Sequence, residues 1–201
     1  MKFLDQEKPL STCMRKNCKG CDVKEKVTCH FTQSQLMKFL IFAFPAFILG
    51  GIGAFLYAWW ALVIFVASIL IYFLFLEIRV MCSHCPHYAE PSTKALTCWA
   101  NYGAPKIWKY RPGPMSFWEK VVFILGMSAV AFTPALFMIL GARFILLAAY
   151  LFLVALEIFI LLNSLCTHCM NFACPFNRVK SDVREKFFDH NPKVKKAWKD
   201  I

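Results

Sequence analysis

The chain has 201 residues, of which 59% are hydrophobic and 17% are charged. This composition excludes an ordinary soluble domain, in which about 25% of the residues are charged, and it indicates an all-α protein of the lipid bilayer. The net charge of +11 does not indicate a nucleic-acid partner, because the basic residues flank long apolar runs and form no separate basic domain.

The N-terminal segment, residues 1–35, is polar and carries four cysteines, Cys13, Cys18, Cys21 and Cys29. Four thiolates this close together are a complete ligand set for one metal centre. The C-x4-C-x2-C spacing partly matches plant-type ferredoxins, in which the fourth cysteine is much more distant. A compact four-cysteine zinc site is equally compatible. A polar segment of this kind is not a signal peptide, so we expect the first membrane span to be retained.

The next segment, residues 36–80, contains an uncharged run from Phe39 to Leu76. At about 1.5 Å of rise per residue, such a run crosses a hydrocarbon core of about 30 Å twice. Trp and Tyr favour the headgroup level, so we place the turn between the two helices near residues 57–60. Gly50, Gly51 and Gly53 lie in the first helix and predict a close helix contact. Residues 36–80 are thus a predicted transmembrane hairpin.

A loop at residues 81–116 follows and begins with Cys82-Ser83-His84-Cys85-Pro86, with Cys98 further on. A C-x2-C pair suits metal ligation because a turn brings both sulfurs to one side, where a metal at about 2.3 Å bridges them. We expect this loop to be a metal-binding segment.

Residues 117–165 form the second predicted hairpin. The apolar run from Val121 to Leu162 is interrupted only by Arg143 and Glu157. Its midpoint, residues 140–143, combines a glycine break with the single cation expected at a membrane interface, so we place the second turn there. Four transmembrane helices in two tandem hairpins follow.

The C-terminal tail, residues 166–201, opens with Cys166-Thr167-His168-Cys169 and has Cys174 before a proline. Four lysines near its end surround Trp198, a pattern that predicts a short interfacial helix on anionic headgroups. The shared C-[ST]-H-C motif after each hairpin indicates a duplicated unit of two helices and a cysteine turn.

The basic residues indicate the orientation of the chain. Two hairpins place residues 1–35, 81–116 and 166–201 on one side of the membrane, and the opposite side has only Arg143. Cytoplasmic loops concentrate Lys and Arg, so we expect a cell-membrane protein with both termini in the cytoplasm. The residues before the first span and between the hairpins that carry this signal are Lys2, Lys8, Arg15, Lys16, Lys19, Lys24, Lys26, Lys38, Arg79, Lys94, Lys106, Lys109, Arg111 and Lys120.

All ten cysteines fall in or beside these three polar segments. In a reducing cytoplasm, clustered cysteines are more often metal ligands than structural disulfides, and disulfides here would require the inverted topology. The predicted ligands are Cys13, Cys18, Cys21, Cys29, Cys82, Cys85, Cys98, Cys166, Cys169 and Cys174.

Each repeat supplies three cysteines, whereas a tetrahedral site or a cubane cluster needs a fourth ligand. His84 or His168 would complete each site if its ring turned toward the cysteines, although a residue inside the pair points away in a helix. The two C-x2-C pairs would otherwise share one site, or an N-terminal cysteine would complete it. All three arrangements remain open at this stage.

Two acidic residues lie within the predicted spans. Glu77 precedes its cysteine motif by five residues and Glu157 by nine. An intramembrane carboxylate is a candidate for a proton path or an ion contact. Glu77 also has a simpler interpretation, an interfacial ion pair with a neighbour such as Arg79.

These features favour a membrane-bound iron-sulfur redox protein or subunit over structural zinc, because a cluster carrier at a basic face suits an acidic soluble electron donor and a membrane acceptor. Any enzymatic activity would then be that of an oxidoreductase. Two alternatives remain, a scaffold with zinc knuckles and a small metal or proton transporter. No Walker loop, nucleophile elbow or dinucleotide fingerprint supports a hydrolase or a nucleotide enzyme.

Overall fold

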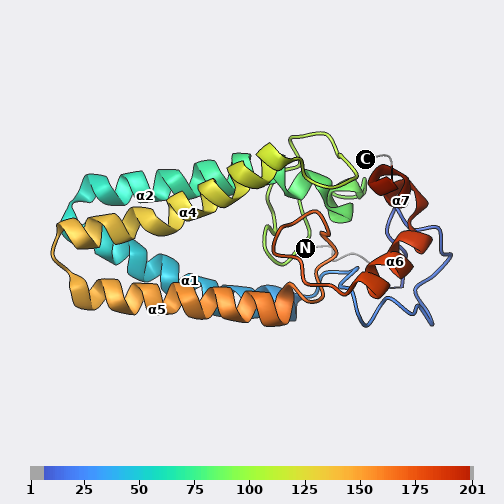
Figure 1. Cartoon of the computed structure of the whole chain (residues 1–201), viewed down its shortest axis with the longest axis horizontal. Coiled ribbons are helices and arrows are strands. Elements are labelled where there is room, and N and C mark those ends of the chain that lie inside the picture. Colours follow the sequence, from blue (N-terminus) through green and yellow to red (C-terminus); the bar gives the residue numbers. More distant parts are fainter. Residues whose placement is uncertain (1–6, 200–201) are drawn as a thin grey trace.

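The computed structural model describes residues 7–199, so Lys2 lies outside the described residues. Within that range the protein is helical and has no strand, only an isolated bridge between Ala95 and Pro105. Four helices are long and apolar enough to cross a membrane, and they indicate a multi-pass membrane protein (Figure 1). They span Gln33–Tyr57, Trp59–His84, Phe117–Leu140 and Phe144–Leu165.

The first two spans are joined by a break of one residue. Helix α1 (Gln33–Tyr57) ends where Ala58 adopts an extended backbone, and α2 (Trp59–Ile71) begins at once. Helix α2 continues through the π-helical segment η1 (Tyr72–Leu76) into α3 (Glu77–Val80). The turn predicted near residues 57–60 is confirmed.

The second pair of spans turns at the predicted residues, although not in the expected way. Helix α4 (Phe117–Leu140) and α5 (Phe144–Ile160) flank residues 141–143. The residue with a left-handed backbone is Ala142, with φ of 51°, whereas Gly141 has φ of −87°. Helix α5 also ends in a π-helical segment, η4 (Leu161–Leu165), directly before Cys166.

Small residues set the spacing of the four spans, as predicted. Helix α1 lies against α2, α4 and α5. A Cβ atom on Gly53 would lie 2.1 Å from Met138 Cε, and one on Gly50 would lie 3.2 Å from side chains of Phe65, Pro134 and Tyr150. Because lipid provides no hydrophobic drive between helices, this close contact is what holds the bundle together.

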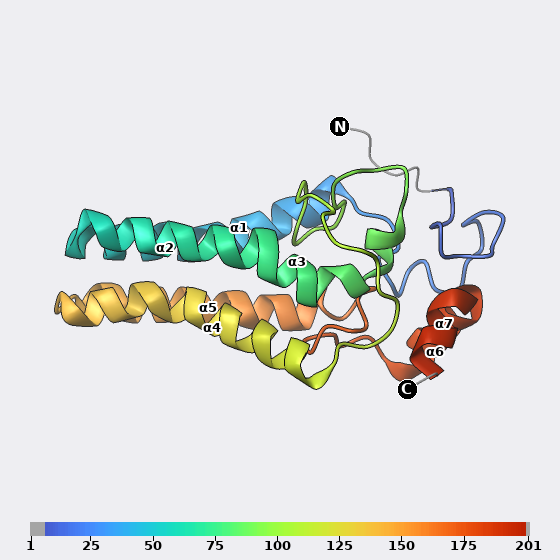
Figure 2. The same ribbon diagram turned by 90° about the horizontal axis from the view of Figure 1, so that it is seen from above.

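The polar segments gather at one end of the bundle. Figures 1 and 2 show the N-terminal segment, the loop between α3 and α4 and the C-terminal tail at the same end, opposite the two turns. The loop includes the short helices η2 (Cys82–His84) and η3 (Pro86–Ala89). The tail folds into α6 (Ser181–His190) and α7 (Pro192–Lys199).

Helix α7 occupies the site of the predicted interfacial helix, but its tryptophan packs on protein. The Trp198 and Phe188 ring centroids are 5.4 Å apart, and the Arg184 guanidinium lies 5.9 Å from the Trp198 ring. Val194 is buried in the same cluster. Trp198 therefore fixes α7 to α6. This contact was not predicted from the sequence.

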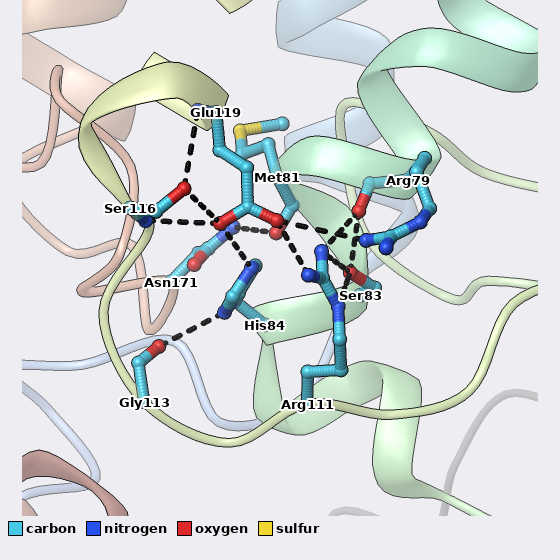
Figure 3. A network of polar contacts seen from close by, with 9 residues as sticks. All are labelled: Arg79, Met81, Ser83, His84, Arg111, Gly113, Ser116, Glu119 and Asn171. Carbon is cyan, nitrogen blue, oxygen red and sulfur yellow. Dashed lines mark hydrogen bonds and ion pairs between the residues drawn. The ribbon is translucent and has the colours of Figure 1, made fainter.

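A polar network ties the loop to the start of α4 (Figure 3). Ser116 caps α4, since its hydroxyl accepts from the Glu119 N–H at 3.3 Å while its own N–H donates to Glu119 Oε2 at 2.9 Å. Arg111 donates to Glu119 Oε1 and, at 2.6 Å, to the Arg79 carbonyl. These bonds hold the loop close to the bundle end.

The glycine contacts lead to a stability prediction. A Cβ on Gly126 would lie 2.4 Å from Cε2 of Tyr72, whose hydroxyl donates to the Phe123 carbonyl at 3.0 Å. The rigid ring cannot yield, so we expect Gly126→Val to lower the free energy of unfolding by about 1–3 kcal/mol. Gly51→Ala is the control, because its Cβ would meet only Leu62 at 3.6 Å. Unfolding in detergent measures both, and equal losses would contradict the packing argument.

Candidate metal centres

Six cysteines from the two C-[ST]-H-C repeats line one cavity. This membrane-end cavity, of 240 Å³, lies where the four spans meet the polar segments. Its cysteines are Cys82, Cys85, Cys98, Cys166, Cys169 and Cys174. Of the three arrangements for a fourth ligand, a site shared by both C-x2-C pairs is the one that this geometry favours.

Local turns bring these sulfurs together. The Cys85 N–H donates to the Cys82 carbonyl at 3.0 Å, and Pro86 then starts η3, so the first pair forms a tight turn at the helix end. In the second repeat the Cys174 N–H donates to the Asn171 carbonyl at 3.2 Å, and the Arg178 N–H to the Cys166 carbonyl at 3.1 Å. Each segment folds back on itself directly after its membrane helix.

Cys98 enters the cavity on a separate small loop. The Gly103 N–H donates to the Leu96 carbonyl at 2.9 Å, and Gly103 has φ of 85°, a conformation that favours glycine. The loop also carries Asn101, whose amide Nδ2 donates to Cys82 Sγ at 3.3 Å and whose backbone N–H donates to Cys98 Sγ at 3.3 Å. Asn101 thus supplies hydrogen bonds to two of the sulfurs.

The ten cysteines, all of which lie within residues 7–199, form no disulfide. Burial raises the pKa of the Cys98 thiol to about 11 and that of Cys174 to about 12. Burial, and then the neighbouring Cys85, raises the pKa of Cys169 well above its usual value. These thiols are protonated at neutral pH, so metal binding has to release protons and strengthens as pH rises.

Both intramembrane carboxyl groups line the membrane-end cavity. Glu77 is buried, with 4% of the residue exposed, and its Oε2 has no hydrogen-bond partner among residues 7–199. The simpler interpretation of Glu77, an ion pair with Arg79, is wrong. Arg79 instead pairs with Glu119 at 3.6 Å and lies over the ring of Trp108. Glu157 is half-buried on α5.

The two histidines inside the motifs are placed away from the membrane-end cavity. A ring nitrogen of His84 is 3.1 Å from the Gly113 carbonyl and the other is 3.5 Å from Glu119 Oε2 (Figure 3). His168 is exposed and contacts Thr167 and the Ser164 carbonyl. The predicted ligation by His84 or His168 therefore finds no support in this geometry.

His87 lines the membrane-end cavity in their place. It is 4% exposed, and its Nδ1 has no partner among the described residues. Burial lowers the pKa of His87 to about 4, so the ring is neutral and its nitrogen is available to a metal or a hydrogen-bond donor. The signal in the sequence was its position two residues after Cys85, within a C-P-H triplet.

The four N-terminal cysteines line a second cavity, of 30 Å³, against α6. The Cys18 N–H donates to the Glu7 carbonyl at 3.1 Å, the Met14 N–H to the His190 carbonyl at 2.9 Å, and Gly20 turns the chain with φ of 63°. Burial, and then the other three cysteines, raises the pKa of Cys29 to about 12. The four thiols that the spacing predicted as one ligand set thus line one cavity, although no three of their sulfurs lie within 4.8 Å of one another.

His190 adds a candidate ligand that the sequence did not reveal. Ligand atoms of Cys21, Asp22 and His190 all lie within 4.8 Å of one another, the one such set of three among residues 7–199. His190 comes from α6, which follows Cys21 by more than 150 positions. No local pattern could have joined them.

The spacing of the sulfurs bears on the size of the bound group. Tetrahedral Zn–S bonds of about 2.3 Å place thiolates about 3.8 Å apart. No three cysteine sulfurs among the described residues lie within 4.8 Å of one another. No three of the six sulfurs around the membrane-end cavity are therefore placed in this structure as a tetrahedral ion would place them.

Comparison of the chain with protein-family models, curated proteins and solved structures gives no match.

A cross-linking experiment checks that both repeats face one cavity. We expect a short bifunctional thiol reagent to join Cys85 to Cys169 in metal-free protein at alkaline pH, because both cysteines line the same cavity. Mass spectrometry of the digest identifies the linked peptides. Cross-links confined to cysteines of the same repeat would contradict the shared cavity, and Cys85→Ser is the control for the assignment.

Proposed function

We propose that this protein carries an iron-sulfur group in the membrane-end cavity and moves electrons at the cytoplasmic face of the cell membrane, as a redox protein or a subunit of one. The observation that carries the proposal is the meeting of six thiols from both repeats around one buried cavity. Thiolates are the usual ligands of such groups, and six of them exceed what a single tetrahedral ion takes.

The residues present fit a group of this kind. The cavity is lined by apolar side chains and thiols, and Asn101 donates hydrogen bonds toward two sulfurs. When bound, an iron-sulfur group supplies one-electron transfer. The protein holds the group through its cysteines, donates hydrogen bonds to the sulfurs and excludes water, and these are the factors that set its potential.

The N-terminal cysteines supply an outer site in this proposal. The N-terminal segment lies beyond the bundle end, further from the membrane spans than the loop that carries Cys85 (Figures 1 and 2). Cys85, Met170 and Val27 belong to one packed cluster of buried residues. The N-terminal Cys13, Cys21 and Cys29 pack against this cluster. We place electron entry at the outer site and transfer through this cluster to the membrane-end cavity.

Topology and partners complete the proposal. The four spans form two tandem hairpins that arose by duplication, and the polar end faces the cytoplasm, where the Lys and Arg residues are concentrated. An acidic soluble electron donor would be attracted to this basic end, which also suits anionic lipid.

Zinc remains the second candidate for the outer site. The 30 Å³ cavity and the close set of Cys21, Asp22 and His190 are of a size for one ion. Zinc there would fix α6 to the N-terminal segment and make this end of the protein a docking surface for a partner.

Metal analysis tests the proposal. We expect protein purified anaerobically in mild detergent to contain iron and acid-labile sulfide, with a broad visible absorption that bleaches with dithionite. Replacing Cys82 and Cys169 by serine should remove the part of that absorption that belongs to the membrane-end cavity, whereas Cys13→Ser should spare it. Stoichiometric zinc without colour would refute the redox function.

The hydrogen bond from Asn101 leads to a prediction about potential. Loss of the amide donor in Asn101→Leu disfavours the more negative, reduced state of the bound group. A net hydrogen-bond energy of about 1 kcal/mol corresponds to a shift of about 40 mV toward lower potential for one electron. Redox titration followed by absorption measures the shift. Asn177→Leu is the control, because the Asn177 side chain donates to backbone carbonyls of Cys169 and Asn171 and not to sulfur.

A further inference from the structure

The membrane-end cavity is not confined to the cysteines. It continues between the spans along apolar side chains from α1, α2, η1, α4 and α5, which include Phe47, Phe65, Phe73, Met127 and Val154. The chamber therefore connects the thiols with the depth of the hydrocarbon region. Its walls there carry almost no polar groups except the two carboxyls of Glu77 and Glu157 and the hydroxyl of Tyr150, which donates to the Ala131 carbonyl.

We propose that this chamber binds a membrane quinone, with its ring between the carboxyls of Glu77 and Glu157 and its apolar tail between the spans. The inference rests on the proposed function, which supplies the electrons. Sites for small molecules are typically apolar with a few placed polar groups, and this chamber has that composition.

The carboxyls distinguish a quinone from a lipid chain as the occupant. A buried polar atom without a partner is costly, and Glu77, which lines the chamber together with Glu157, has such an atom in Oε2, which has no hydrogen-bond partner among residues 7–199. An acyl chain would leave it unpartnered. A quinone offers two carbonyl oxygens on opposite sides of a flat ring, so each carboxyl can donate to one of them when it carries a proton.

The same contacts provide for the reaction. Reduction of a quinone to its quinol takes two electrons and two protons, and an O–H bond forms at each ring oxygen. The electrons would come singly from a soluble one-electron reductant, and the cysteines that line the cavity would hold the group that passes them on. The protons come from the cytoplasmic solvent through the two carboxyls, which release and regain them. The two carbonyl π bonds of the quinone are lost as its ring becomes aromatic, and each carboxyl O–H bond that breaks is remade with a proton from the solvent.

Photolabelling tests the binding directly. We expect an azidoquinone analogue to label peptides of α1 and α5 that line the chamber, in the full protein as purified in detergent, and excess decylquinone to displace it. Ala131→Phe, which fills the chamber, should weaken labelling at least tenfold. Ala129→Phe makes the same change on the exposed face of α4 and should leave labelling within twofold. Labelling that decylquinone does not displace, or equal effects of the two variants, would overturn the site.

Conservative carboxyl variants test the roles of the two glutamates. Glu77→Gln and Glu157→Gln keep the shape of the side chain and a hydrogen-bond donor at its end. We therefore expect labelling within threefold of that of the unmodified protein and an unchanged visible spectrum. The rate of quinone reduction by a chemically reduced protein should fall at least tenfold in each. A full rate in the double variant would refute the proton-transfer role.

The outcomes separate the two proposals. Protein without iron but with displaceable labelling would remove the redox function and leave a quinone-binding protein. Protein with a reducible iron-sulfur group but no displaceable labelling would keep the redox function and overturn the quinone site.

Discussion

The bilayer imposes the constraint on which the rest of this structure depends. Backbone polar groups in the hydrocarbon have no water to bond, so the crossing segments are helices and every turn with exposed backbone lies at their ends. The spans come in two pairs that are consecutive in the chain. The first pair is residues 33–57 and 59–84, and the second is residues 117–140 and 144–165. All ten cysteines thereby lie at one end of the bundle. Close contacts at Gly50, Gly53 and Gly126 let the spans pack closely against one another.

Enclosure changes the chemistry of the cysteines. Buried thiols keep their protons, so a group that several thiolates held here would have to displace those protons. Asn101, from a loop turned by Gly103, points its donors at two of the sulfurs. The outer site has a different character, with an exposed Asp22 bonded to His190 at 2.9 Å, and a single packed cluster joins the two.

The membrane-end cavity is also a junction between environments. The part next to the polar segments is lined by loop residues and thiols. The part between the spans is lined by Phe and Val side chains, and Glu77 and Glu157 line the same cavity. In the proposed function, this composition lets one site serve a soluble partner at one end and a lipid-soluble molecule at the other. The π-helical segments η1 and η4 lie in the same region, and such irregularities are frequent at functional sites.

Much of this was determined by the sequence alone. Hydropathy and helix rise fix four spans, the aromatic and glycine positions fix their turns, and short spacing fixes the N-terminal thiol group, because all of these are local properties. Only the tertiary structure decided which distant residues meet. It placed six cysteines of two repeats around one cavity, turned His84 and His168 away from it, brought in His87 and Asn101, and set His190 beside Cys21. Those contacts depend on how helices and loops that are far apart in the chain pack together. Neither the periodicity nor the spacing of residues along the sequence predicts this packing.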